Sequence, residues 1–372
     1  MPTRASTANP PRLWDQAAIE TAVAQHERFL KGARGGRRAF LQYADAPGVD
    51  CRRRLLNDAD LTGANLEGAV LAGSHFERAA LYCANLEGCD LRAANLRRAD
   101  MRGARLAGAV LSGAVMDEAD MRAAYIAFPT GHEGLHVFRH GAQPRNRLAV
   151  GGRGADFTNC AMRGARLCAA NLKGADFTGA VLAAADLSGA KLTDAVFCDT
   201  VMDGVDLSRL MLTPDQIAGC VFAPGPAEQA RAEEVRERLR RAEEWAASGG
   251  RTGAPAVIDS EDLRPLAAAF RGRTLTALSA RNVRAVCLDF SGGSFQGAVF
   301  DGADLRGAIF DGCDLRGASF SRAKLAHARF VGADLRPLVL PSGRHHHASF
   351  DGACLERADF TRAVATRLAA RV

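Results

Sequence analysis

The sequence is poor in aromatic residues, with 18 Phe, three Tyr and two Trp among 372 residues. A core of large interlocking rings is therefore excluded, and something more repetitive must fill the interior. The chain also lacks an apolar run of 18 residues, and its first residues lack the apolar stretch of a secretory signal. We therefore expect neither a membrane span nor classical export, and a cytoplasmic location.

Motifs that carry chemistry are also scarce. The ten cysteines show no C-x-x-C spacing, so we interpret them as reduced thiols rather than as metal or redox ligands. We find no Gly-rich phosphate loop, nucleophile elbow or carboxylate pair that would indicate catalysis. The sequence therefore predicts a protein that is not an enzyme and needs no cofactor or metal.

What the sequence has is a five-residue repeat. Every fifth residue is apolar over 56–126, 157–222 and 290–360, and His345 is the only exception among 44 such centres. Alanine occupies 30 of the 44 positions two residues before a centre. A period of five fits neither an α-helix nor a β-strand, so the chain must turn a corner in each repeat, with the centre and the alanine inside.

The phenylalanines indicate how many corners close one coil. Bulky rings should stack on the same interior face of successive coils, and these rings recur at every fourth repeat, which gives four repeats per coil. The predicted core rings are Phe157, Phe177 and Phe197 in one block and Phe290, Phe310, Phe330 and Phe350 in another. This stacking requires residues 341–349 to form an irregular half-coil that keeps Phe350 on the face of Phe330.

These repeats resemble the pentapeptide-repeat family, whose pattern is Ala-(Asp/Asn)-Leu-x-x. The match is close in ADLTGANLEGA (59–69) and ADLRGAIFDGCDLRGASF (303–320). The resemblance implies an all-β solenoid, namely a right-handed, quadrilateral parallel β-helix with one repeat on each of its four sides. Open ends of such a rod would expose unpaired backbone groups, so we also expect helical caps.

Breaks in the repeat suggest the domain organisation. The steps from Ile126 to Phe157 and from Phe222 to Phe290 are not multiples of five, which indicates insertions. We predict an N-terminal segment with an amphipathic capping helix (1–50), a β-helix (51–222) with an insertion loop (127–154), a charged helical connector (223–287), a second β-helix block (288–362) and a C-terminal cap (363–372).

Two histidine motifs invite a metal interpretation. His132, Glu133 and His136 fit the H-E-x-x-H pattern of zinc hydrolases, which needs a helix to bring both histidines to one face. Nearby Pro129 and Gly134 argue against that helix, so a surface loop is our prediction and a zinc hydrolase a remote alternative. The triplet 345–347 follows Pro, Ser and Gly and is predicted to be a solvent-exposed turn.

The insertion loop is the predicted partner-binding element. Charges in the repeat blocks sum to −3, whereas the remainder of the chain sums to +9. The loop combines apolar and basic residues, of which we single out Leu135, Phe138, Arg139, Arg145 and Arg147. The alternative is a loop that simply folds back on a coil face.

The leading functional hypothesis is a non-catalytic scaffold that mediates protein–protein interaction. The family resemblance supplies an alternative, because some members mimic B-form DNA and bind DNA gyrase, but that requires a strongly acidic rod and this one is near neutral. Direct nucleic-acid binding is disfavoured because the basic residues of the connectors alternate with Glu and lack aromatic partners. We thus expect a protein partner and no membrane association, with homodimerisation through the terminal coils left open.

Overall fold

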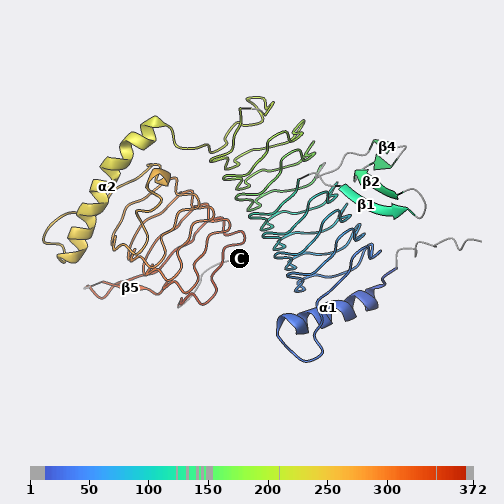
Figure 1. The fold of residues 1–372 in the computed structure, drawn as a ribbon. Coiled ribbons are helices and arrows are strands. Elements are labelled where there is room, and N and C mark those ends of the chain that lie inside the picture. Colours follow the sequence, from blue (N-terminus) through green and yellow to red (C-terminus); the bar gives the residue numbers. More distant parts are fainter. Residues whose placement is uncertain are drawn as a thin grey trace, which may run out of the picture. The chain divides into compact units, whose positions relative to one another are not determined.

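The computed structural model describes residues 13–122, 154–208, 210–340 and 342–365, together with the backbone of four short strands between 125 and 147. The chain forms two compact units, Met1–Ala223 and Pro224–Val372 (Figure 1). Each unit is described by itself. Within the described ranges, no helix is both long and apolar enough to cross a bilayer.

The first unit is a stack of coils in which strands of one coil pair with strands of the next. One column of parallel bridges runs through Asp60, Ala80, Asp100 and Asp120, each separated from the next by four repeats. Each corner is closed by a short backbone bond, as from Ala64 N to Leu61 O at 3.0 Å. Four repeats therefore make one coil, and the coils are joined by backbone hydrogen bonds of parallel β type.

The coils start earlier than the sequence predicts. Phe40 already bridges Asp60, and Asp45 bridges Asn65, so residues 39–50 belong to the β-helix and not to a separate N-terminal segment. Arg54 stands where alanine is usual, two residues before the centre Leu56, and this irregularity hid the earlier repeats. The β-helix of this unit thus begins before residue 51.

The interior consists of the repeat centres and the small residues two positions before them. In the first unit, the rings of Phe157 and Phe177 stack with centroids 4.9 Å apart, and those of Phe177 and Phe197 with centroids 5.1 Å apart. All three side chains are fully buried. Phe76 is a further buried ring, and most other centres are leucine or methionine, so rings are few and flexible apolar side chains fill most of this interior.

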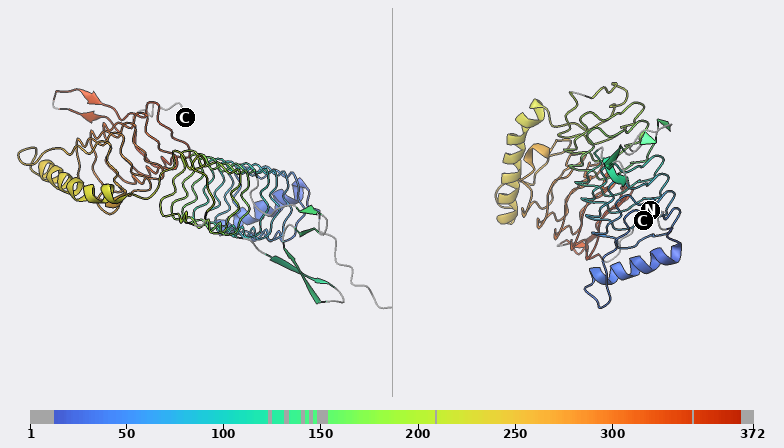
Figure 2. Two further views of the ribbon diagram at one scale, coloured as in Figure 1. Left: turned by 90° about the horizontal axis from the view of Figure 1, so that it is seen from above. Right: turned by 45° about the vertical axis from the view of Figure 1, so that its right-hand side comes forward.

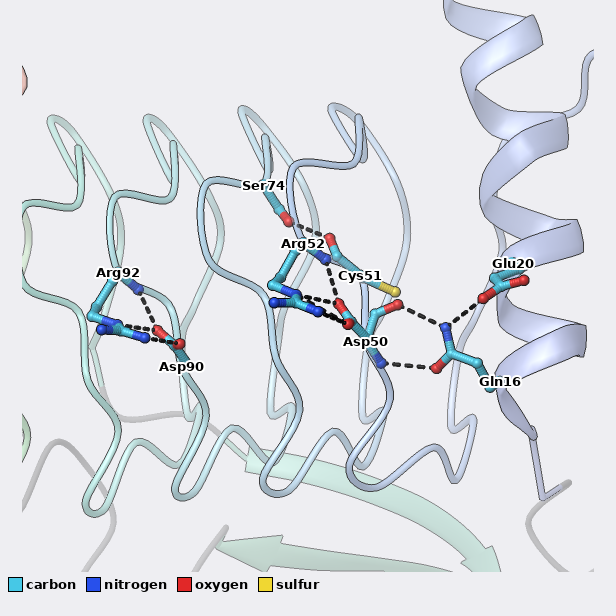
Figure 3. A network of polar contacts seen from close by, with 8 residues as sticks. All are labelled: Gln16, Glu20, Asp50, Cys51, Arg52, Ser74, Asp90 and Arg92. Atoms are coloured by element: carbon cyan, nitrogen blue, oxygen red, sulfur yellow. Dashed lines mark hydrogen bonds and ion pairs between the residues drawn. The ribbon is translucent and has the colours of Figure 1, made fainter.

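Helix α1 (Gln16–Leu30) covers the first coil (Figures 1 and 3). It buries Ile19 and Val23 against the coil. The Gln16 amide donates to Asp50 O and accepts from Asp50 N, both at 2.8 Å, and so takes the place of a preceding strand. The Glu27 carboxylate likewise accepts from Leu55 N at 3.2 Å. The helix therefore satisfies backbone groups that an open end would leave unpaired.

An excursion leaves the coil after Arg122. It contains β1 (Tyr125–Thr130) and β2 (Gly134–Arg139), which pair antiparallel, and β3 (Ala142–Gln143) and β4 (Asn146–Arg147), which also pair. The repeat centre predicted at Ile126 is wrong, because its backbone lies in β1 opposite Phe138. The described coil resumes at Gly154.

The second unit opens with helix α2 (Pro226–Ala247), which buries Ala232, Val235, Leu239 and Ala242. The prediction of a helical connector over 223–287 is wrong beyond this helix. Val257 bridges Ser279 and Thr274 bridges Ser294, so β-coils start near residue 256. The 3-10 helix η1 (Arg264–Leu266) lies inside the first of these coils. That coil is two residues longer than four repeats, and the extra residues displaced the five-residue period.

The second unit also contains an excursion, and it overturns the predicted place of Phe350. Ser319 bridges Ser349, which is six repeats later instead of four, because a segment that includes β5 (Leu338–Val339) and β6 (His345–His346) leaves the coil. Phe350 consequently stacks on Phe320, with centroids 5.1 Å apart, and meets Phe330 edge-on. The segment is a paired hairpin and not a half-coil.

The other predicted rings of this unit do form one column. The rings of Phe290 and Phe310 stack with centroids 4.7 Å apart, and those of Phe310 and Phe330 with centroids 5.1 Å apart. At the C-terminal end, Val364 bridges Asp334 as a further strand and not as part of a helical cap. The rest of the predicted cap, 366–372, lies outside the described residues.

Candidate interaction surface

The outward side chains of many strands form the same ion pair. The carboxylate of an aspartate at the strand centre accepts hydrogen bonds from the arginine two residues later. Both the backbone N–H and the guanidinium of that arginine donate, as Arg92 does to Asp90 (Figure 3). The arginine holds the pKa of Asp90 below its usual range. The same pair recurs as Asp50/Arg52, Asp100/Arg102, Asp120/Arg122, Asp314/Arg316 and Asp334/Arg336. These strands therefore neutralise their own carboxylates.

One row of outward side chains in the first unit adds an aromatic ring to this pattern. Two residues after the bridge column of Asp60, Ala80, Asp100 and Asp120, successive coils present Thr62, Tyr82, Arg102 and Arg122, which we call the tyrosine row. The Arg102 guanidinium carbon lies 5.2 Å from the centre of the Tyr82 ring. A cation over a ring face in this way is stabilised by the ring quadrupole.

Arg102 is held from two sides. Besides its contact with Tyr82, it binds Asp100 at 2.6 Å, which raises the pKa of the guanidinium. Further along the row, burial tends to raise the pKa of Asp120, but hydrogen bonds from Arg122 lower it below its usual range. The row thus presents an aromatic ring and guanidinium groups in fixed positions.

The tyrosine row ends where the first excursion begins. Arg122 is the last described coil residue before β1, and β1 and β2 stand away from the coils (Figures 1 and 2). Among the residues singled out from the sequence, Leu135 pairs with Pro129 and Arg139 with Tyr125. Phe138 also lies in β2 and Arg147 in β4, whereas Arg145 lies outside the described residues.

Neither histidine motif forms a metal centre in the parts of the chain that the structure describes. His136 lies in the extended strand β2 opposite Phe128, and not on a helix, while His132 and Glu133 are outside the described residues. His345 and His346 are exposed in β6. In those described parts, no group of three or more His, Cys, Asp or Glu side chains is placed to hold a metal ion.

Several cysteines occupy the small interior position. Cys89 and Cys313 are buried, and each donates its thiol to a backbone carbonyl of the preceding coil, Leu66 O at 2.9 Å and Phe290 O at 3.0 Å. Burial raises the pKa of both thiols to about 12. These thiols are therefore protonated and unreactive at neutral pH.

The tyrosine row was missed in the sequence because tyrosine and arginine occupy outward positions, where any polar residue fits. A signal did exist, since Tyr82, Arg102 and Arg122 recur at every fourth repeat, which is the length of one coil. The spacing places them on one face, but it does not reveal that the ring and guanidinium touch.

The comparisons with known proteins agree with the repeats. The family model for pentapeptide repeats matches eight copies, over residues 55–93, 94–125, 153–189, 180–213, 286–322 and 298–336. This chain belongs to the pentapeptide-repeat family, a class of β-helical repeat protein. No curated protein matches the chain.

Solved structures of pentapeptide-repeat proteins are similar at low identity. A trypsin-treated form of QnrB1, a plasmid-mediated fluoroquinolone resistance protein, is 17% identical, covers 55% of this chain and 92% of its own, and gives a TM-score of 0.27. HetL, involved in heterocyst differentiation regulation in the cyanobacterium Nostoc, is 17% identical, with 91% and 96% coverage and a TM-score of 0.16. A pentapeptide repeat protein from the Arabidopsis thaliana thylakoid lumen is 24% identical, with 39% and 70% coverage and a TM-score of 0.21.

Proposed function

We propose that this protein is a non-catalytic scaffold that binds another protein through the tyrosine row and the adjoining strands β1 and β2. The observation that carries the proposal is the contact of Arg102 with both Tyr82 and Asp100 on an outward face. The side chains of Arg102, Tyr82 and Asp100 all point outward, so this contact is not needed to build the core.

Tyrosine and arginine are the residue types that contribute most to protein interfaces. The Arg102 side chain is already ordered by Asp100 and Tyr82, so a partner would pay little of the entropy that binding a free arginine costs. Strand β2, which follows the row along the chain, carries the apolar and basic residues Leu135, Phe138 and Arg139. From the sequence we add Arg147, in β4, and Arg145, which lies outside the described residues.

Mimicry of DNA, with gyrase as the target, is the alternative function. It would require an extended track of uncompensated carboxylates along the rod. The outward aspartates of the Asp-x-Arg pairs are bound by arginines instead, as Asp90 is by Arg92. We therefore favour a partner that is recognised by aromatic and guanidinium contacts.

The test uses two arginines in the same local setting. Arg102 and Arg92 each bind an aspartate two residues earlier at 2.6 Å, but only Arg102 contacts a tyrosine. The intact chain is used to capture its partner from a cell extract, and the affinity of the purified pair is then measured. Arg102→Ala and Tyr82→Ser should each weaken binding about tenfold or more, whereas Arg92→Ala should leave it unchanged. Equal losses at Arg102 and Arg92 would place the interface elsewhere.

A further inference from the structure

The end of the first unit carries a concentrated positive charge. Between the last turn of α1 and the first coil, five cationic side chains occur close together in the sequence, and all five residues are exposed. We call this group the basic cap: Arg28, Lys31, Arg34, Arg37 and Arg38.

Two neighbouring carboxylates interact electrostatically with Lys31 and Arg38, but their ion pairs are with arginines outside the basic cap. Glu27 is bound by Arg54 at 2.8 Å, and Asp58 is bound by Arg78 at 2.8 Å. Arg38 donates to the backbone carbonyl of Asp58 and not to its carboxylate. The positive charge at this end is thus left for a ligand.

Helix α2 shows why this arrangement is unusual in the chain. It is also rich in arginine, but its arginines Arg236, Arg240 and Arg241 bind glutamates three or four residues away on the same helix. Charge along the sequence already separates the two regions, because residues 28–38 carry five cations and no carboxylate, whereas α2 carries five arginines and six glutamates.

The backbone of the basic cap is fixed against α1. Ala33 N donates to Arg28 O at 2.9 Å, and Arg37 N donates to Gln25 O at 3.0 Å. Gly36 lies so close to the helix that an added Cβ would come within 2.3 Å of Phe29 N. The backbone that carries the cations is therefore ordered before a ligand binds, which lowers the entropy cost of binding.

Two exposed aromatic rings flank the cations. Phe40 is 63% exposed, and the Arg38 guanidinium carbon lies 5.3 Å from the centre of its ring. Phe29 is 44% exposed and stacks on His26. Cations that track a phosphate backbone, together with rings on which bases stack, are the two elements that bind single-stranded nucleic acids.

We propose that the basic cap binds single-stranded nucleic acid. An acidic peptide would pair with the cations but leave both rings unused. An anionic membrane would require an apolar helix face, and α1 has buried Ile19 and Val23 against the first coil. Nucleic acid uses the charge and the rings together, and this function is independent of the protein partner proposed above.

The test measures binding of the intact chain to fluorescent oligo-dT and oligo-U by anisotropy over a range of salt concentrations. If all five cations contact phosphates, the logarithm of the association constant should fall with the logarithm of salt concentration with a slope of about −3.5. The triple variant Lys31→Gln/Arg34→Gln/Arg37→Gln should reduce the slope to about −1.4. Phe40→Ser should weaken binding but keep the slope.

The matched control removes the same charge from ion-paired positions. Arg52→Gln/Arg92→Gln/Arg336→Gln should bind like the parent, because these arginines are held by aspartates in their own strands. Circular dichroism checks that each variant folds. The proposal is overturned if both triple variants bind equally, if duplex DNA binds as tightly as single strands, or if poly-glutamate or anionic vesicles bind more tightly than the oligonucleotides.

Discussion

The two units interrupt the same coil in different ways. An uninterrupted coil pairs residues that are four repeats apart. In the first unit Val110 instead bridges Asp156, a separation that is not a multiple of five, and in the second Ser319 bridges Ser349, six repeats away. The first excursion breaks the five-residue period and is visible in the sequence. The second adds two whole repeats, so the period continues and conceals it.

The comparison shows that the repeat period and the interior column that a side chain joins are separate properties of a solenoid. The period tells which residues point inward, whereas the place where the chain returns to the coil decides which column a ring joins. Phe350 points inward as predicted, but it joins the column of Phe320. A second signal was present, since Ala-Ser-Phe at 318–320 recurs at 348–350.

The largest expected effect tests the interiors of the two units. Phe310→Ala should lower the free energy of unfolding of the second unit by about 3–5 kcal/mol, because Phe310 is fully buried between stacked and edge-on rings. Leu86→Ala should cost the first unit about 2–5 kcal/mol. Denaturant titrations follow each unit by its single tryptophan, Trp14 or Trp245, in variants that keep only one of them.

Each core variant should shift only the transition of its own unit. If Phe310→Ala shifted the transition reported by Trp14 as strongly as that reported by Trp245, the two units would not unfold separately.

The next effect concerns how the second excursion lies on its coil. Gly317 and Gly312 are both corner residues with positive φ, 67° and 64°. An added Cβ at Gly317 would lie 2.8 Å from the Leu338 Cβ, whereas at Gly312 it meets nothing within 4 Å. Gly312→Ala should cost about 1 kcal/mol for its backbone conformation, and Gly317→Ala about 1–3 kcal/mol more from crowding against β5. Chemical denaturation measures both, and equal costs would mean that β5 does not contact this corner.

The contact between helix α1 and the first coil should make the stability of the first unit depend on pH. His26 is buried between α1 and the first coil, where Ala39 N donates to its Nδ1 at 3.1 Å and its Nε2 lies 2.9 Å from Asn57 O. Burial lowers the pKa of His26 below its ordinary value; the hydrogen bond with Asn57 O and the charges of Asp58 and Glu27 oppose this effect, and Arg38 reinforces it.

Because the pKa of His26 is lower in the folded chain, the unfolded chain binds the proton more readily. The stability that His26 contributes to the first unit should therefore be fully present above about pH 6.5 and decline as the pH falls below that value. His26→Gln should flatten this dependence, and His75→Gln, at an exposed position, should preserve it. Denaturation of the Trp14 reporter at several pH values provides the measurement, and an unchanged slope in His26→Gln would contradict the assignment.

The smallest effect is expected from removing the second excursion. Deleting Leu338–His347 together with Pro337→Gly would leave Arg-Gly-Ala-Ser-Phe, the same five residues as 316–320. The coil should close with Phe350 still stacked on Phe320, and the melting temperature should change by no more than about 2 °C, as for surface changes below 0.5 kcal/mol. A large drop by calorimetry would show that β5 and β6 stabilise the coil.

Most of the fold follows from residues whose role is local. The repeat period, the four-sided coil and the rings at 157, 177 and 197 could all be predicted, because each inward position repeats the same choice of Leu or Phe with a small residue. The start of the β-coils at Phe40 could not be predicted, because Arg54 replaces the small inward residue at the point where the repeat pattern would have been extended toward the N-terminus. The candidate surfaces were less predictable, since outward positions accept any polar side chain.

The sequence by itself determined the period of five, the inward residues and the family of the protein. Only the tertiary structure decided that Phe350 joins Phe320, that Arg102 lies on Tyr82, and that Glu27 beside the basic cap is bound by Arg54. The physical reason is that burial of a repeat centre is dictated by its own strand and corner. The column that a ring joins, and the contact between Arg102 and the Tyr82 ring, depend on residues one coil or more away.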